Sequence, residues 1–116
     1  MKLEFLLVPT TDLAASLALY RDGLGWPEAW REGDAAVVLK MPGTDVQLML
    51  DANDPTAPVG PIFIVDSVQD FHAGRPSSLL ADAEPDAIPG GYLAAYTDPA
   101  GATVYVMDQS EDVVVQ

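Results

Sequence analysis

The stretch that decides the fold runs from Ala95 to Gln109 and reads AYTDPAGATVYVMDQ. Two apolar runs, Leu93 to Tyr96 and Thr103 to Met107, flank the turn sequence Asp98-Pro99-Ala100-Gly101. This turn breaks any helix and lets the chain reverse, so the pattern predicts a β-hairpin. Tyr105 lies between two valines in the second strand, and its side chain must point to the face opposite theirs. It either binds something in an enclosed space or fills the core.

The composition excludes several classes of function. A chain of 116 residues without cysteine is expected to form one domain, with no disulfides, thiolate metal sites or cysteine nucleophiles. The apolar run at the start ends at Pro9 without a cleavage site, so we expect a strand and not a signal peptide. No apolar run reaches the roughly 20 residues of a membrane span. We therefore expect a cytoplasmic protein with no membrane partner.

The charge is strongly negative. Eighteen acidic residues stand against five basic ones, for a net charge of −13. Such a surface repels nucleic acid and favours a cationic small molecule over an anionic one. An acidic surface that serves only solubility is the alternative, and the sequence leaves both open.

The first half of the chain predicts a strand, a helix and three more strands. Leu3 to Val8 is an apolar run typical of a buried strand. An amphipathic helix of about three turns follows, with Thr10 or Thr11 as its cap and its end at Gly23 or Gly25. Period-two patterns then predict strands at Trp26 to Arg31, Ala35 to Met41 and Val46 to Leu50.

The second half repeats this order. Pro61 to Val65 predicts a strand, and Ser67 with Asp70 predicts the capped start of a short helix. Further strands are expected at Leu79 to Ala83, Gly91 to Thr97 and Thr103 to Met107. We therefore expect an α+β fold over residues 1–116, with modules at about 1–52 and 60–116 and a loop at about 53–59. The tail SEDVVVQ is expected to pair at an edge or to fray.

The twofold βαβββ pattern, together with two motifs, resembles the vicinal oxygen chelate superfamily of glyoxalase, bleomycin-resistance and extradiol dioxygenase domains. The first motif comprises Asp12, Tyr20 and Leu24-Gly25-Trp26, and the second is Tyr96 followed by Asp98-Pro99-Ala100-Gly101. The resemblance covers nearly the whole chain. It implies a curved mixed sheet around a cup, often closed by dimerisation, so a homodimer is expected.

The resemblance also implies where a metal would bind, because metal-dependent members place ligands on the first and last strands of each module. Those positions fall on Phe5, Gln47, Pro61 and Tyr105. A divalent first-row metal takes about three nitrogen or charged oxygen ligands, which this set does not supply. We therefore expect no metal, no cofactor and no catalytic residue there, although a register shift of one would bring in Glu4. His72, the one histidine, is expected on the second helix, away from the cup and without a carboxylate partner.

Aromatic side chains at these positions favour a ligand-binding cup. The expected ligand-binding residues are Phe5, Trp30, Gln47, Met49, Tyr92, Tyr96 and Tyr105. The alternative is that these side chains fill the cup and leave no cavity. Trp26 and Trp30 share a face if their strand is regular, and either stack on a ligand or cover a sheet edge or dimer contact.

Four aspartates are candidates for local roles. Asp45 and Asp51 flank the face that carries Gln47, where they either set a negative field or are solvated strand ends. Asp12 and Asp98 belong to the two motifs, and we expect a helix cap and a turn from them.

Three functions follow from these observations. The first is a metal-free protein of the bleomycin-resistance type that sequesters a cationic, partly planar ligand, with antibiotic resistance implied by the resemblance alone. The second is a lyase, isomerase or dioxygenase whose metal ligands lie elsewhere in the chain. The third is an acidic interaction module with a filled cup. The sequence determines neither the ligand nor whether the modules are swapped between chains.

Overall fold

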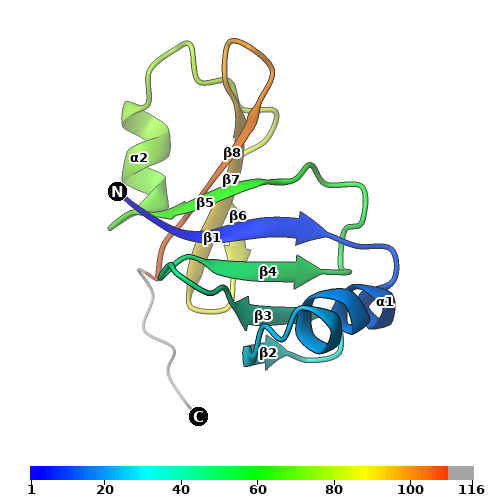
Figure 1. Cartoon of the computed structure of the whole chain (residues 1–116). Coiled ribbons are helices and arrows are strands. Elements are labelled where there is room, and N and C mark those ends of the chain that lie inside the picture. The colour runs from blue at the N-terminus through cyan, green and yellow to red at the C-terminus, as the bar shows by residue number, and fades with distance from the viewer. Residues whose placement is uncertain (110–116) are drawn as a thin grey trace. The chain divides into compact units, whose positions relative to one another are not determined.

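The computed structural model describes residues 1–109, and the chain divides into two compact units (Figure 1). The N-terminal unit is Glu4–Gly60, and the C-terminal unit is formed by Met1–Leu3 and, within the described residues, 61–109. The end of the chain, for which pairing or fraying was expected, lies outside the described residues.

The N-terminal unit has the expected order of strand, helix and three strands. Its elements are β1 (Lys2–Pro9), α1 (Leu13–Leu17), η1 (Ala18–Gly23), β2 (Glu28–Glu32), β3 (Ala36–Lys40) and β4 (Gln47–Asp51). The strands lie in the order β2-β3-β4-β1. Strand β1 runs parallel to β4, and the other neighbours are antiparallel.

The helical segment differs from the expected three-turn helix. Asp12 is the N-cap, because its carboxylate accepts a hydrogen bond from Ala15 N at 3.0 Å. The capping role expected of Thr10 or Thr11 is wrong: the Thr10 hydroxyl instead accepts from Asp12 N. After one α-helical turn the chain widens into the π-helix η1, which ends with Leu24 N donating to Leu19 O at 2.8 Å.

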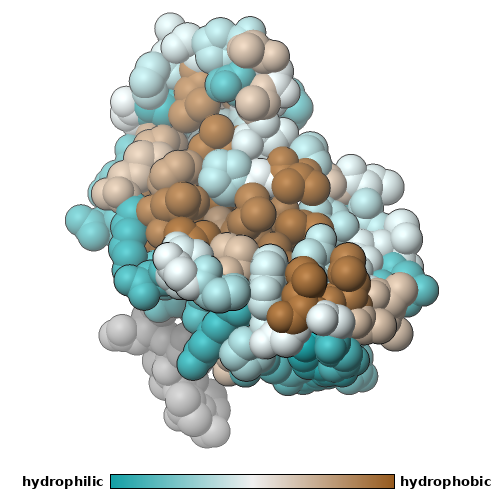
Figure 2. Space-filling view, in the orientation of Figure 1, coloured by the Kyte–Doolittle hydropathy of each residue, from teal (hydrophilic) through white to brown (hydrophobic). Residues whose placement is uncertain are grey.

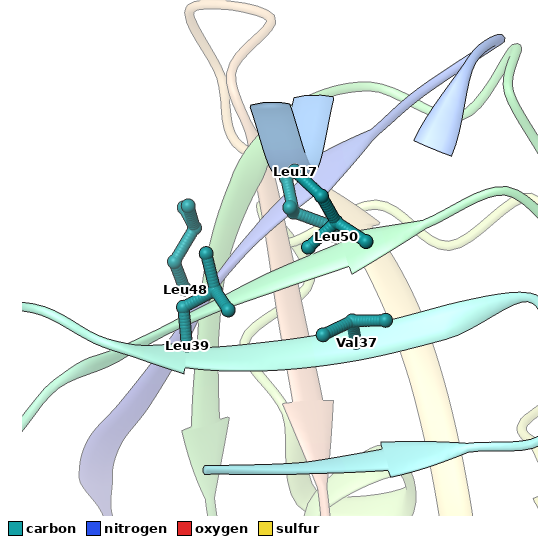
Figure 3. Packing of buried hydrophobic residues seen from close by; sticks show 5 residues of the cluster. All are labelled: Leu17, Val37, Leu39, Leu48 and Leu50. Carbon is teal, nitrogen blue, oxygen red and sulfur yellow. The ribbon is translucent and has the colours of Figure 1, made fainter. Parts of the chain in front are cut away.

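The core of the N-terminal unit lies between α1 and one face of its sheet. Alternate residues of β3 and β4 point toward Leu17 of α1, as Figure 3 shows. The buried cluster consists of Leu17, Val37, Leu39, Leu48 and Leu50. Tyr20 and Trp26 pack against it with their ring centroids 5.5 Å apart. The face of this sheet that points away from α1, which we call the N-distal face, carries the other half of the strand residues.

The outer side of the helical segment is partly apolar. Leu19 and Leu24 are each 54 % exposed. Figure 2 shows hydrophobic surface over this segment, at the lower right, next to hydrophilic surface below it. None of the helices within residues 1–109 is long and apolar enough to cross a membrane.

The C-terminal unit repeats the same topology. Its elements are β5 (Gly60–Ile64), α2 (Val68–Gly74), β6 (Asp86–Ile88), β7 (Gly91–Thr97) and β8 (Thr103–Met107). The order β5-β8-β7-β6, with β5 parallel to β8, matches that of the first unit strand for strand. Ser67 caps α2 by accepting a hydrogen bond from Asp70 N at 3.1 Å, as predicted.

The strand expected at Leu79 to Ala83 is wrong. Only Leu80 in that stretch bridges to β7, opposite Thr97. The strand forms instead at Asp86–Ile88, directly before the turn at Pro89-Gly90, where Gly90 takes a φ of +86°. A tight turn places the residues beside it in register with β7, and this local closure outweighs the apolar pattern further upstream.

The hairpin of β7 and β8 is confirmed. The Asp98 carboxylate accepts from Ala100 N at 2.8 Å and from Ala102 N at 2.9 Å, and Gly101 adopts a φ of +92°. On one face of this sheet, α2 covers a buried cluster of Val68, Ala94, Tyr96 and Val106. We call the opposite face the C-distal face.

Candidate functional site

The N-distal face carries four of the predicted ligand-binding residues in three cross-strand rows. Because paired residues point to the same side of a sheet, the strand register places each side chain. The rows are Lys40–Gln47–Phe5, Trp30–Val38–Met49–Leu7 and Glu32–Ala36–Asp51–Pro9. The sequence therefore predicted correctly that Phe5, Trp30, Gln47 and Met49 lie together.

Two aromatic rings meet on this face. The Phe5 and Trp30 centroids are 6.4 Å apart with an interplanar angle of 81°, an edge-to-face contact. Phe5 is 6 % exposed, whereas Trp30 is 44 % exposed. The contact thus holds the indole against Phe5 and leaves part of Trp30 accessible.

The expectation that Trp26 and Trp30 share a face is wrong. A register shift between Glu28 and Trp30 places Glu28 opposite Leu39, on the α1 side, and Trp30 opposite Val38, on the N-distal face. Such a bulge turns every following side chain to the other face. Trp26 precedes it and packs on the α1 side.

Two carboxylates lie in the row next to Trp30. Glu32 and Asp51 stand on either side of Ala36, two strands apart, so their Cα atoms are separated by about 10 Å. The Asp51 carboxylate accepts from Asn53 N at 2.8 Å and from Asn53 Nδ2 at 2.9 Å, which orients it. Sequence analysis missed Glu32, although its position two residues after Trp30 was the available signal.

The charges along this face are unequal. Lys40 lies at the opposite end of β3 from Ala36, a separation of about 13 Å along the strand. Asp45 precedes β4 and is exposed. The acidic end of the face is therefore the row that holds Glu32 and Asp51.

Two of the cationic side chains are engaged on the other face of the same sheet. Arg31 and Arg21 both donate to Glu28, and Arg21 also donates to Asp22 at 2.9 Å. Hydrogen bonding from Arg31 lowers the pKa of Glu28, and hydrogen bonding from Arg21 lowers the pKa of Asp22. These arginines do not neutralise the Glu32 row.

The C-distal face carries Tyr105 but none of the other predicted tyrosines. Tyr105 pairs with Ile62 on β5 and with Ala95 on β7. Pro61 is one residue out of phase with Ile62, so its assignment to the same face as Tyr105 is wrong.

The expectation that Tyr92 and Tyr96 join Tyr105 is also wrong. Both pack against the cluster beneath α2, because residues 92, 94 and 96 alternate with Ala95, the partner of Tyr105. The Tyr96 hydroxyl lies 2.8 Å from Nδ1 of His72. His72 also has a carboxylate neighbour, Glu84, which sequence analysis did not find.

The residues at the implied metal positions do not fit a metal. Phe5 offers no donor atom, Gln47 a neutral amide, Ile62 none and Tyr105 a phenol, whereas first-row metals take imidazole, carboxylate or thiolate. Within residues 1–109, no group of three or more histidine, aspartate or glutamate side chains is arranged to hold a metal ion.

Two βαβββ modules of one topology, with the Asp-Pro-x-Gly hairpin at the end of the second, define the class of protein. The family model of the Glyoxalase/Bleomycin resistance protein/Dioxygenase superfamily matches residues 2–106. The chain belongs to this superfamily.

Solved structures agree on the fold. The methylmalonyl-CoA epimerase of Streptomyces coelicolor, as a variant in complex with 2-nitronate-propionyl-CoA, is similar at 16% identity and a TM-score of 0.71, covering 95% of this chain and 98% of its own. The Mycobacterium tuberculosis methylmalonyl-CoA epimerase is 15% identical, with a TM-score of 0.70 and coverages of 92% and 87%. A superfamily member from Vibrio splendidus 12B01 is 17% identical, with a TM-score of 0.59 and coverages of 90% and 95%. No curated protein sequence matches the chain significantly.

Proposed function

We propose that this protein binds a cationic, partly planar small molecule without a metal and sequesters it on the N-distal face. The observation that carries the proposal is the adjacency of two rows, one with the accessible indole of Trp30 and the next with the carboxylates of Glu32 and Asp51. An exposed indole attracts both flat apolar rings and cations. The carboxylates attract the positive group of the same molecule.

The neighbouring side chains suit this role. Phe5 contacts Trp30, and Met49, in the cross-strand row of Trp30, is a flexible apolar side chain that adapts to different ring shapes. Gln47 offers an amide that can both donate and accept. Lys40 at the far end of the face disfavours a ligand with positive charge at both ends.

The overall charge of −13 supports a cationic ligand by long-range attraction. Binding alone suffices for sequestration, so the function requires no catalytic residue. A role in antibiotic resistance, which rests on superfamily membership, belongs to the same proposal, as does the cytoplasmic location expected from the sequence.

A homodimer is part of the proposal. Strand β2 is an edge strand of the sheet in the N-terminal unit, and β6 is an edge strand in the C-terminal unit. An edge strand that nothing covers can pair with a strand of another chain. Tyr105 is proposed as a ligand-binding residue of the C-terminal unit, on the basis of the superfamily pattern alone.

Calorimetric titration with N-methylquinolinium, a planar permanent cation, tests the function. We expect Trp30→Leu to weaken binding about fivefold or more, since a stacking aromatic contributes about 1–3 kcal/mol. Phe5→Ala, which removes the ring that holds Trp30, should weaken binding in the same direction. Leu80→Ala, at an exposed apolar position outside the face, is the control and should leave binding unchanged. Tyr105→Ala tests the role proposed for Tyr105. Unmeasurable binding, or equal affinity in all variants, contradicts the proposal.

The enzyme alternative has a separate test. A metal-dependent lyase, isomerase or dioxygenase requires stoichiometric zinc, nickel, manganese or iron in the purified protein. Native mass spectrometry reports metal content, oligomeric state and retained small molecules in one spectrum. A metal-free dimer supports the binding function, and stoichiometric metal supports the enzyme.

A further inference from the structure

Three titratable side chains from separate parts of the C-terminal unit form a hydrogen-bonded chain. His72 lies on α2, Tyr96 on β7, and Glu84 in the loop of residues 75–85 that follows the helix. His72 Nδ1 is 2.8 Å from the Tyr96 hydroxyl, and His72 Nε2 is 3.2 Å from Glu84 Oε2. None of these residues belongs to the N-distal face, so this hydrogen-bonded chain shares no residue with the ligand site proposed there.

The geometry assigns a direction to each hydrogen bond. Tyr96 is 1 % exposed, and burial raises the pKa of its phenol, so the hydroxyl keeps its proton. The Glu84 carboxylate can only accept, so Nε2 donates to it, and the other nitrogen of a neutral imidazole, Nδ1, accepts from the Tyr96 hydroxyl. A neutral histidine satisfies both partners only in this tautomer.

Arg75, the first residue of the same loop, holds that end in place by hydrogen bonds to two backbone carbonyls. Its Nη1 donates to the His72 carbonyl at 2.7 Å, and its Nε donates to the Leu79 carbonyl at 3.1 Å. The guanidinium carbon is 5.8 Å from the centre of the Tyr96 ring. Both ends of the loop thus meet at His72 and Tyr96.

The middle of the loop covers the edge of β7. Leu80 N donates to Thr97 O at 3.0 Å, and Thr97 N donates to Leu80 O at 2.8 Å. Strand β6 pairs only with residues 91 to 93 of β7, so this bridge protects the other end of the strand. An uncovered strand edge is a template for pairing with another chain.

We propose that the loop 75–85 is a strap over the edge of β7, and that the chain from Glu84 through His72 to Tyr96 is the latch that keeps it closed. When the Glu84 contact breaks, the bridge between Leu80 and Thr97 opens while the core beneath α2 stays packed. The strap is thus a local opening unit, distinct from global unfolding. Glu84 is 87 % exposed at its side chain, so the latch is weak enough to open often.

Nuclear magnetic resonance of ¹⁵N-labelled protein at neutral pH tests the latch, and His72, the one histidine in the sequence, needs no assignment. The expected spectrum shows a protonated Nε2 and an unprotonated Nδ1. Tyr96→Phe combined with Glu84→Ala, which removes both partners of the imidazole, should give a mixture of tautomers. A neutral imidazole with its proton on Nδ1 in the wild-type protein would overturn the proposal.

Hydrogen exchange at the Leu80 and Thr97 amides tests the strap. Glu84→Ala should speed their exchange by about two- to fivefold, whereas Asp82→Ala, which removes another exposed carboxylate of the same loop, should not. The Val65 amide, bonded to Met107 O at 2.9 Å in the same unit, should be unchanged in both variants. Equal exchange in the two variants, or equal acceleration at Val65, contradicts a separate strap.

Discussion

The Asp108 carboxylate is one of the most constrained groups in the molecule. It is 1 % exposed, and its two oxygens accept from Val68 N at 2.5 Å and from Tyr92 N at 2.9 Å. It therefore ties the first residue of α2 to the start of β7. Gly91 lies against it so closely that an added Cβ would collide with Asp108 Oδ1 and with the Asp108 carbonyl oxygen.

Gly91→Ala should lower the free energy of unfolding by about 3 kcal/mol, because the backbone of Asp108 cannot move away as a flexible side chain could. Urea titration measures this change. Gly74→Ala is the matched control, since nothing lies within 4 Å of its added Cβ, and stability should be unchanged or slightly higher. Equal stability of the two variants would contradict the close packing.

Tyr96 predicts an alkaline dependence of stability. Burial raises the pKa of its phenol above the usual 10.0, Arg75 lowers it and Glu84 raises it. The folded state thus holds the phenol proton more tightly than the unfolded state. The stability that the protonated Tyr96 contributes is therefore intact below about pH 10 and is lost as the pH rises further. Tyr96→Phe should lose less stability than wild type between about pH 9 and about pH 11, measured by urea titration. The same loss of stability in both proteins would show that folding does not raise the pKa of Tyr96.

At the scale of elements, α1 is held by packing more than by its own five residues, since so short a helix is unstable alone. Leu17→Ala should cost about 3 kcal/mol in unfolding free energy, because it empties space among Val37 and Leu50 of the buried cluster. Leu19→Ala, in the same helical segment but 54 % exposed, should change stability by less than about 0.5 kcal/mol. Similar losses in the two variants, measured by urea titration, would contradict the packing of α1.

The strands could be predicted to within two or three residues wherever the period-two pattern was long, as in β4. The bulge at Glu28 and Trp30 could not, because it depends on pairing with β3 and leaves no signature in the residues themselves. That one irregularity decides which tryptophan reaches the N-distal face. The place of β6 was missed for a related reason, since the turn at Gly90 set its register.

For the whole molecule, the repeated topology and the superfamily could be predicted because each motif contains an aspartate whose hydrogen bonds to nearby backbone amides mark the boundary of an element. Asp12 caps α1 and Asp98 shapes the β7–β8 turn, as the sequence indicated. The candidate site was predicted in part: four residues share the N-distal face, whereas Tyr92 and Tyr96 pack under α2. Tyr105 pairs with Ala95, and side chains alternate between the two faces along β7, so Tyr92 and Tyr96 must point to the face opposite Tyr105.

The net charge of −13 predicts salt-dependent binding. Affinity for N-methylquinolinium should fall about threefold or more between about 50 mM and about 500 mM sodium chloride, because screening weakens attraction beyond about 10 Å. Calorimetry at several salt concentrations measures it. An affinity that does not change with salt would assign the acidic surface to solubility alone.

The most direct test of the proposed function compares N-methylquinolinium with 1-methylnaphthalene, a neutral molecule of the same shape, by titration of wild type, Glu32→Gln and Asp34→Asn. Asp34 lies in the turn after Glu32 and gives the same change of charge away from the N-distal face. We predict that wild type prefers the cation by about tenfold, and that Glu32→Gln loses most of this preference while Asp34→Asn keeps it. Equal affinity of wild type for both molecules would contradict a cation site at Trp30, Glu32 and Asp51.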